Sequence, residues 1–331
     1  MRQKLNENGG KIMTDTRAQE FIRDKAGNVV GVKATMTNGQ KIDFSAKSVV
    51  LASGGYGANR AMLPKKVASY LFYGLDSETG DGLAMGKKIG AGTINLDLVK
   101  QYPQGVETLP HHALAATASS TDTMKKSGAI YVNRDGKRIV DELAGLGTLT
   151  KITEAQKDSI MYIVMDKAAW KQYVAKSLED KLVAAPSDLD KWAKIVNNGY
   201  PVMATSAKLA DAAKTMGINA KGLQATIARW NGFVKAGADK DFGRKVLMPF
   251  GEGPYYIVEQ KPRFQTTLGG LKANADMQIL NKKGQPIGNL FGAGCVVGGA
   301  NGSDSLTAMM NSWAIISGVV AGDSAVKNLK K

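Results

Sequence analysis

The sequence predicts an α/β fold with an α+β insertion, in which a β-sheet is interrupted by a mostly helical unit and then resumed. Residues 11–44 alternate short β-rich runs, of which residues 11–14 are the first, with turn signals, whereas residues 113–245 are richer in charged helix formers. Strand signals return between residues 255 and 294. With 331 residues, 44% of them hydrophobic, the chain is long enough for two domains that each bury a core.

The first part of the chain is predicted to be an antiparallel meander. Asn38-Gly39 separates two β-rich runs, residues 29–36 and 41–44, and this dipeptide strongly favours a hairpin turn. An apolar run then starts at Val49 and ends in a glycine-rich turn, which is typical of a buried parallel strand.

Helices and further strands follow in an order that can be read from the same signals. Thr79-Gly80-Asp81-Gly82 is typical of a helix start and of an anion-binding turn. We expect helices at residues 60–70, 79–91, 152–157, 166–178, 187–196, 208–236 and 306–321, and strands at residues 129–133, 255–259, 277–280 and 289–294.

Composition excludes several classes of protein. The net charge is +15, but the lysines are scattered and lack interleaved aromatic residues, so we expect no nucleic-acid partner. Cys295 is the single cysteine and His111 and His112 are the two histidines, which excludes a disulfide framework and the usual zinc sites. The sequence has no signal peptide and no apolar run long enough to span a membrane, so we expect a cytoplasmic protein.

Two strand-to-glycine turns, at residues 49–57 and 290–299, point to a ligand site. Glycines at the carboxyl ends of parallel strands let a ligand approach the backbone, and amides at a following helix start face negative charge. Either turn alone is equally consistent with a plain structural turn, but together with residues 79–82 they favour a dinucleotide site. The usual Gly-x-Gly-x-x-Gly fingerprint is nevertheless missing.

Six ordered motifs resemble the flavoprotein family of fumarate reductase, succinate dehydrogenase, flavocytochrome c and urocanate reductase. They lie at residues 46–59, 79–86, 101–103, 128–142, 267–271 and 288–294. The resemblance implies an incomplete, Rossmann-like FAD-binding domain at residues 1–98 and 267–331, and a capping domain at residues 99–266. It also implies that the segment with the pyrophosphate fingerprint is supplied from elsewhere, by further coding sequence or a companion chain.

The resemblance implies site residues as well. Tyr102 is the candidate catalytic residue, and a small molecule is the expected substrate. The positions implied to contact FAD are Ala52, Ser53, Gly54, Gly55, Asn59, Thr79, Gly80, Asp81, Gly82, Gly294, Cys295, Ser305, Met309 and Met310.

Four positions depart from the family's fumarate reductases. Tyr102 and Thr266 stand where those enzymes have histidines, and Ser305 and Leu146 stand where they have arginines. A leucine cannot donate a proton, and a serine cannot form the paired hydrogen bonds of a guanidinium. Fumarate is therefore not the expected substrate. Tyrosine also occurs at the first position in urocanate reductases, where it can orient a heteroaromatic ring.

Several of these residues keep two interpretations. Cys295 replaces a family glutamate and is either a small buried residue or a redox-active thiol. His111 and His112 are either exposed loop residues or proton carriers. The side chains of Met309 and Met310 are expected to pack the last helix, while their amides face the flavin.

Two hypotheses about function remain open. In the first, the chain is an FAD-dependent oxidoreductase that reduces an activated alkene by hydride transfer. In the second, it is a truncated non-catalytic remnant or a partner-dependent subunit that does not hold FAD alone.

Overall fold

The computed structural model describes residues 2–306 and 308–329, which form two compact units. Unit 1 comprises residues 1–68, 74–100 and 266–331, and unit 2 comprises residues 69–73 and 101–265. The expected FAD-binding and capping roles of such segments stay predictions. No helix within the described ranges is both long and apolar enough to span a membrane. The cytoplasmic location likewise stays a prediction.

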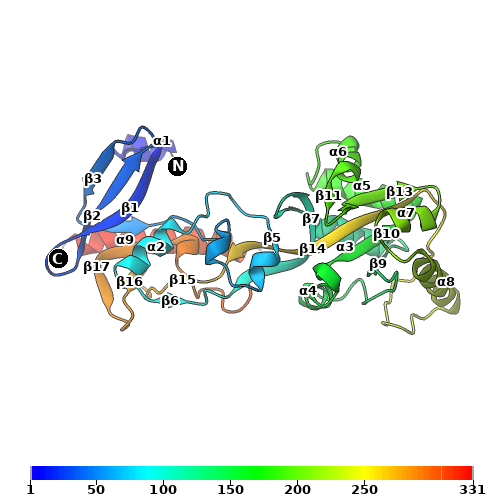
Figure 1. The fold of residues 1–331 in the computed structure, drawn as a ribbon. Coiled ribbons are helices and arrows are strands. Elements are labelled where there is room, and N and C mark those ends of the chain that lie inside the picture. Colours follow the sequence, from blue (N-terminus) through cyan, green and yellow to red (C-terminus); the bar gives the residue numbers. More distant parts are fainter. Residues whose placement is uncertain (1, 307, 330–331) are drawn as a thin grey trace. The chain divides into compact units, whose positions relative to one another are not determined.

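Unit 1 contains the predicted meander and a small sheet with a parallel pair of strands (Figure 1). The meander runs antiparallel through β1 (Thr16–Arg23), β2 (Val29–Met36) and β3 (Lys41–Ser45). The second sheet has the order β16-β17-β4, with β16 (Gln278–Leu280), β17 (Pro286–Gly292) and β4 (Val49–Leu51). Further elements are α1 (Arg2–Glu7), α2 (Asp81–Lys88), α9 (Met309–Asn328) and the short pair β6 (Thr93–Ile94) and β15 (Gly270–Leu271).

Unit 2 is built on one mixed sheet in the order β5-β8-β7-β14-β10-β9, with β13 pairing beside β14. The strands are β5 (Leu71–Phe72), β7 (Val99–Leu109), β8 (His112–Ala115), β9 (Ile130–Val132), β10 (Met161–Met165), β13 (Met203–Ser206) and β14 (Tyr255–Thr267). The helices are α3 (Thr117–Lys126), α4 (Leu146–Glu154), α5 (Lys167–Glu179), α6 (Pro186–Asp190), α7 (Leu209–Thr215) and α8 (Ala220–Ala236), and β11 (Val196–Asn197) pairs with β12 (Tyr200–Pro201).

Helices outweigh strands within residues 113–245, as the sequence predicts, but the strand β10 was missed. All five of its residues are buried, and alternate ones belong to different cores. Met161 and Ile163 pack in a core with residues of α3, α4 and α5, whereas Tyr162 and Val164 pack with residues of α7 and α8. A strand covered on both faces has no alternating pattern, so its sequence does not distinguish it from a buried helix.

Several predicted element boundaries also differ from the structure. Residues 60–70 form only short 3₁₀ turns, because Pro64 holds Leu63 in an extended conformation. The helix expected at residues 208–236 is two helices, separated at Gly217 (φ +67°) and restarted by the Asn219 side chain. The helix expected at residues 187–196 becomes α6, a 3₁₀ turn and β11, and residues 11–14 are not a strand.

The expectation of a buried strand at Val49 is only partly correct. β4 pairs parallel with β17, as expected, but Val50 is 40% exposed. Within the described residues, no strand pairs with the other edge of β4.

A buried charge cluster fastens the loop after α8 to the sheet of unit 2. Arg138 bonds Glu142 at 2.8 Å and Asp239 at 3.1 Å, and Arg244 bonds Glu142 at 3.2 Å. Arg244 also donates to the backbone carbonyls of Met124, Ser127 and Ala129. Each charge is therefore matched inside the protein, where an unmatched one would be costly.

Replacing Arg244 with methionine should destabilise unit 2 by about 3–5 kcal/mol, since it leaves buried carbonyls and a carboxylate short of donors. Urea unfolding followed by circular dichroism measures this change. The control is Arg229→Ala, which removes an ion pair to Asp241 whose side chains are 61% and 27% exposed and should leave the free energy of unfolding nearly unchanged. Equal losses of unfolding free energy in the two variants would contradict the stabilising role of Arg244 in the buried charge cluster.

Candidate functional site

The two glycine-rich turns of the sequence lie next to each other at one edge of the small sheet. Leu51 of β4 is in register with Gly292 of β17, and the Ala293 amide donates to the Leu51 carbonyl at 2.9 Å. Residues 52–55 and 294–295 therefore leave the sheet side by side. Gly54 and Gly294 both have positive φ angles, +75° and +68°, which favour glycine.

The third predicted segment, residues 78–82, is tied to the turn after β4 by backbone contacts. The Gly80 amide donates to the Gly55 carbonyl at 3.1 Å, and the Asn59 side chain donates to the Thr79 carbonyl at 3.0 Å. A Cβ atom on Gly82 would lie 2.0 Å from the Ser53 hydroxyl. We call residues 52–55, 78–80, 266–267 and 294–295 the strand-end cluster. Asn59 and Gly82 hold it together through structural contacts.

The centre of the strand-end cluster holds polar atoms without protein partners. Glu78 Oε2 and Thr267 Oγ1 are buried and accept or donate no hydrogen bond among the described residues. A Cβ atom on Gly55 would lie 2.5 Å from Thr267 Oγ1 and 3.5 Å from Glu78 Oε2. The missing side chain at Gly55 thus lets the Thr267 hydroxyl approach the backbone closely, and the two unsatisfied polar groups beside it are groups with which a polar ligand would pair.

Burial raises the pKa of Glu78 to about 7, against a smaller opposing effect of a hydrogen bond from the Gly55 amide. The carboxyl is thus partly protonated near neutral pH and can donate as well as accept a hydrogen bond. Sequence reasoning missed Glu78 and Thr267. The available signal was their position, directly before Thr79-Gly80 and at the start of the motif at residues 267–271.

Cys295 belongs to the strand-end cluster, and its own thiol is protonated. Burial raises its pKa, and the Thr266 hydroxyl is 3.6 Å from the sulfur. Nearby Glu78 raises the pKa further. A reactive thiol needs a lowered pKa, so the raised pKa does not support the redox-active interpretation of Cys295, which is half-buried.

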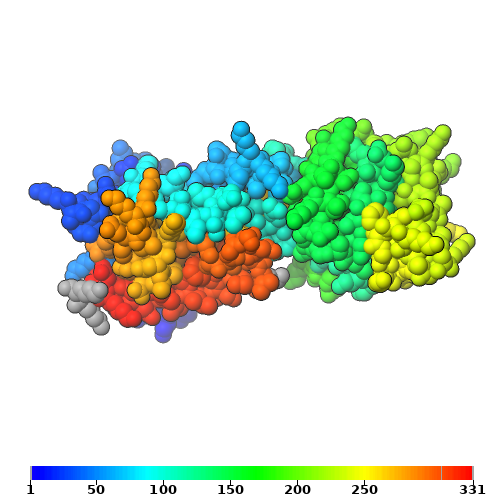
Figure 2. All heavy atoms as spheres, turned by 90° about the horizontal axis from the view of Figure 1, so that it is seen from below, coloured from blue at the N-terminus to red at the C-terminus, as the bar shows by residue number. Residues whose placement is uncertain are grey.

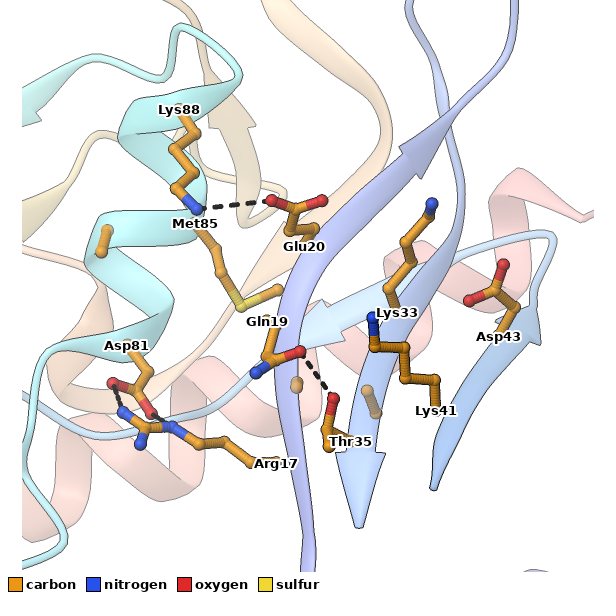
Figure 3. Close-up of a pocket in the computed structure, with 13 residues that line it drawn as sticks. Arg17, Gln19, Glu20, Lys33, Thr35, Lys41, Asp43, Asp81, Met85 and Lys88 are labelled. Atoms are coloured by element: carbon orange, nitrogen blue, oxygen red, sulfur yellow. Dashed lines mark hydrogen bonds and ion pairs between the residues drawn. The ribbon is translucent and has the colours of Figure 1, made fainter. Parts of the chain in front are cut away.

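Asp81, another predicted cofactor contact, points to a different place. Its carboxylate accepts two hydrogen bonds of 2.8 Å from Arg17 of β1, and these bonds lower the pKa of Asp81 (Figure 3). The pair lies in a groove of about 910 Å³ between α2 and the meander, where Lys88 also pairs with Glu20 at 3.5 Å. The charges of Asp81 are thereby satisfied by the protein itself.

The predicted residues near α9 form a separate group at the start of that helix. Ser305 is buried and its hydroxyl bonds Asn301 at 3.2 Å, while the Asn301 amide lies 3.0 Å from the sulfur of Met310. Met309 is exposed, so the expectation that both methionines pack the helix is wrong for Met309. Gly294 connects this helix to the strand-end cluster, because its amide donates to the Ser317 hydroxyl at 2.9 Å.

Tyr102 lies in unit 2, on β7, and contacts an arginine that sequence reasoning missed. Its ring centroid is 4.3 Å from the guanidinium carbon of Arg263 on β14. The ring of Tyr73 lies 4.9 Å from the same carbon. No signal in the sequence marked Arg263, because β14 also carries other polar residues such as Glu259 and Lys261.

The histidines and Leu146 lie elsewhere in unit 2. His111 occupies an exposed turn with φ +65°, as expected, but His112 begins β8 and packs edge-on against Phe72, so the loop expectation is wrong for it. Leu146 is the first residue of α4 and packs against the apolar core.

The strand-end cluster fits a flavin cofactor. It offers a polar, planar ligand the glycine backbone of two adjacent strand ends, together with a carboxyl and a hydroxyl group whose polar atoms are unpaired. Glu78, Thr267 and the backbone of Gly54, Gly55 and Gly294 are the groups that would hold it.

Replacing Glu78 with glutamine should flatten the pH dependence of stability. The folded-state pKa of about 7 lies above the ordinary value of 4.5, so wild-type stability should fall as pH rises from 4.5 to 7. A difference of one between the folded and unfolded pKa values corresponds to about 1.4 kcal/mol, and partial exposure reduces the effect. At pH 8 the variant should therefore gain on the order of 1–2 kcal/mol.

Urea unfolding between pH 5 and 8 measures this difference. Asp276→Asn, which changes an exposed carboxylate of the same unit, is the control and should show no such gain. If the free energy of unfolding of the wild type declines no more steeply with rising pH than that of Glu78→Gln, the raised pKa of Glu78 is refuted.

Known proteins resemble the chain over nearly its whole length. A family model described as FAD binding domain matches residues 1–309. Urocanate reductase from Eggerthella lenta is 33% identical over 322 residues, which cover 95% of this chain and 50% of that protein. Fumarate reductase (cytochrome) from Shewanella frigidimarina is 30% identical over 324 residues, 97% of this chain and 52% of that protein.

A solved structure agrees with these matches. The open conformation of a flavocytochrome c3 fumarate reductase superposes with a TM-score of 0.79 and 27% identity, over 99% of this chain and 54% of that one. The chain spans about half the length of the curated relatives it matches. The predicted α/β fold and the family resemblance of the six motifs are confirmed. The chain belongs to the FAD-binding flavoprotein family of the fumarate and urocanate reductases.

Proposed function

We propose that the chain is part of an FAD-dependent oxidoreductase that reduces an activated alkene. The observation that carries this proposal is the strand-end cluster, where Glu78 and Thr267 present unpaired polar atoms around Gly55. Relatives named for the reduction of urocanate and of fumarate support the reaction type. When bound, FAD supplies the hydride for such a reduction.

The residues of the chain have distinct tasks in this proposal. The hydroxyl of Thr267 and the carboxyl of Glu78 hold polar edges of the cofactor, and Glu78 can keep a proton there because burial raises its pKa to about 7. Gly54 and Gly294 allow the backbone to turn sharply beside the ligand. Tyr102, in unit 2, is the proposed contact to the substrate.

Fumarate is not the substrate that we propose. Leu146 packs against the core of unit 2, where an apolar side chain has no proton to give. Ser305 is hydrogen bonded to Asn301 and carries no charge for a carboxylate. The two positions at which family fumarate reductases are expected to use arginines are therefore occupied by uncharged side chains.

A companion segment is a second element of the proposal. β4 has a free edge within the described residues, and four apolar side chains of α9 are between 54% and 66% exposed. These are Ile315, Ile316, Val319 and Val326. In Figure 2 the red atoms of α9 lie at the surface of unit 1, beside the orange atoms of residues 270–300. A βαβ segment with the glycine fingerprint would cover both features.

The alternative function follows from the same surfaces. If the free edge of β4 and the face of α9 need a partner for flavin binding, the chain alone is a partner-dependent subunit that does not hold FAD. This second candidate predicts a colourless protein that takes up flavin only with the βαβ segment.

Flavin retention decides between the two candidates. The purified chain, mixed with FAD and passed through a desalting column, should stay yellow with close to one equivalent of flavin absorbance. Gly55→Ala should weaken FAD binding at least tenfold, because its Cβ atom would intrude on Thr267. Gly147→Ala adds the same methyl group in unit 2 where nothing lies within 4 Å, and should bind like wild type.

Other outcomes have defined meanings. A colourless chain that becomes yellow only with the βαβ segment would establish the partner-dependent subunit. A chain that takes up no FAD in either form would reject the oxidoreductase proposal.

A further inference from the structure

Arg263 is a buried cation for which the described residues offer no counter-charge. The residue is 4% exposed, and none of its nitrogen atoms pairs with a carboxylate in that part of the chain. Its Nε donates to the Gln104 carbonyl at 3.2 Å and its Nη2 to the Thr117 hydroxyl at 3.1 Å. Nη1 is buried without a hydrogen-bond partner among the described residues.

The other buried arginines of unit 2 show how unusual this is. Arg138 and Arg244 both bond the Glu142 carboxylate, at 2.8 and 3.2 Å. The acids nearest to Arg263 along the sheet are already used, since Lys261 pairs with Glu107 at 2.6 Å and with Glu259 at 2.9 Å. Burial without a counter-charge lowers the pKa of Arg263 to about 10, which still leaves it charged at neutral pH.

The start of helix α3 adds a second positive field at the same place. Thr117, which accepts from Arg263, is the first residue of that ten-residue helix, and its first turn has no acidic residue. Free amides and the helix dipole make such a helix start attractive to anions. A cation against the positive end of a helix is unfavourable by itself, so this arrangement calls for an anion.

The surroundings of the guanidinium favour a flat ligand. The rings of Tyr102 and Tyr73 lie 4.3 and 4.9 Å from its central carbon, and both tyrosines are partly exposed. Aromatic faces stack on planar conjugated groups, and the guanidinium edge pairs with carboxylate oxygens.

We propose that Arg263, Thr117 and Tyr102 form an anion subsite that binds the carboxylate of a planar, conjugated acid. The assignment of this subsite to the substrate rests on the proposed function. Leu146 and Ser305 carry no charge. In this subsite the positive charge comes instead from Arg263 on β14. The Thr117 hydroxyl donates its proton to the anion while its oxygen accepts from Arg263.

Calorimetric titration of the full chain without added FAD tests the subsite independently of flavin binding. The probes are crotonate, a small conjugated carboxylate, and crotonamide, its uncharged counterpart. Wild type should bind crotonate at least tenfold more tightly than crotonamide. Arg263→Gln should abolish that preference, and Thr117→Val should reduce crotonate affinity several-fold while leaving the charge in place.

Arg229→Gln is the matched control, because this arginine is exposed and already paired with Asp241. The crotonate binding of this variant should equal that of wild type.

Circular dichroism reports whether Arg263→Gln is folded. If it is not folded, Thr117→Val and Arg263→Lys carry the test. Unchanged crotonate affinity in both of these variants overturns the subsite. Crotonate binding that survives in folded Arg263→Gln overturns it directly. Inorganic phosphate that binds as tightly as crotonate, in an Arg263-dependent manner, overturns the assignment to a planar carboxylate. Loss of flavin retention with intact crotonate preference would reject only the proposed oxidoreductase.

Discussion

The arrangement of unit 2 depends on the need to satisfy three charged side chains on one buried strand. Glu259, Lys261 and Arg263 alternate along β14, so they share one face of a strand that is buried over most of its length. The neighbouring strand β7 supplies their partners. Glu107 pairs with Lys261, the Gln104 carbonyl accepts from Arg263, and the Tyr102 ring covers its guanidinium. A shift in register between these two strands would leave buried charges without partners, so these polar pairs help to specify the register of β7 against β14.

The same strand also connects the chemistry of the two units along the chain. Its last residues, Thr266 and Thr267, belong to unit 1 and contribute a hydroxyl beside Cys295 and an unpaired hydroxyl beside Gly55. One continuous strand therefore carries the buried arginine of the proposed anion subsite and two residues of the strand-end cluster, the proposed cofactor site. We propose that the uncharged side chains of Leu146 and Ser305, together with the buried charge of Arg263, give this chain a substrate preference of its own.

The parts of the fold that could be predicted are those with local signals. Asn38-Gly39 predicts a hairpin because it stands between two β-rich runs, whereas Asn231-Gly232 lies inside α8. The glycine turns after β4 and β17 mark strand ends. β10 could not be predicted, because burial on both faces removes the alternation that identifies a strand. At the site, glycine positions were accessible from the sequence, whereas Glu78 was marked only by its position before Thr79-Gly80 and Arg263 was not marked at all. A glutamate in a loop and an arginine in a strand normally face water, and only the packing around them makes them unusual. The pairing of Asp81 with Arg17 could not be predicted for the same reason, since the two residues are 64 positions apart.

The uncovered face of α9 and the free edge of β4 have a practical consequence for handling the protein. Unpaired strand edges and apolar patches are the surfaces through which copies of a chain associate and precipitate. In a concentrated preparation of the chain alone, self-association through these surfaces would compete with any partner for the same groups. Yield and apparent size would then vary with concentration and with the order of mixing. Adding the partner during synthesis, before the chain accumulates, would avoid that competition.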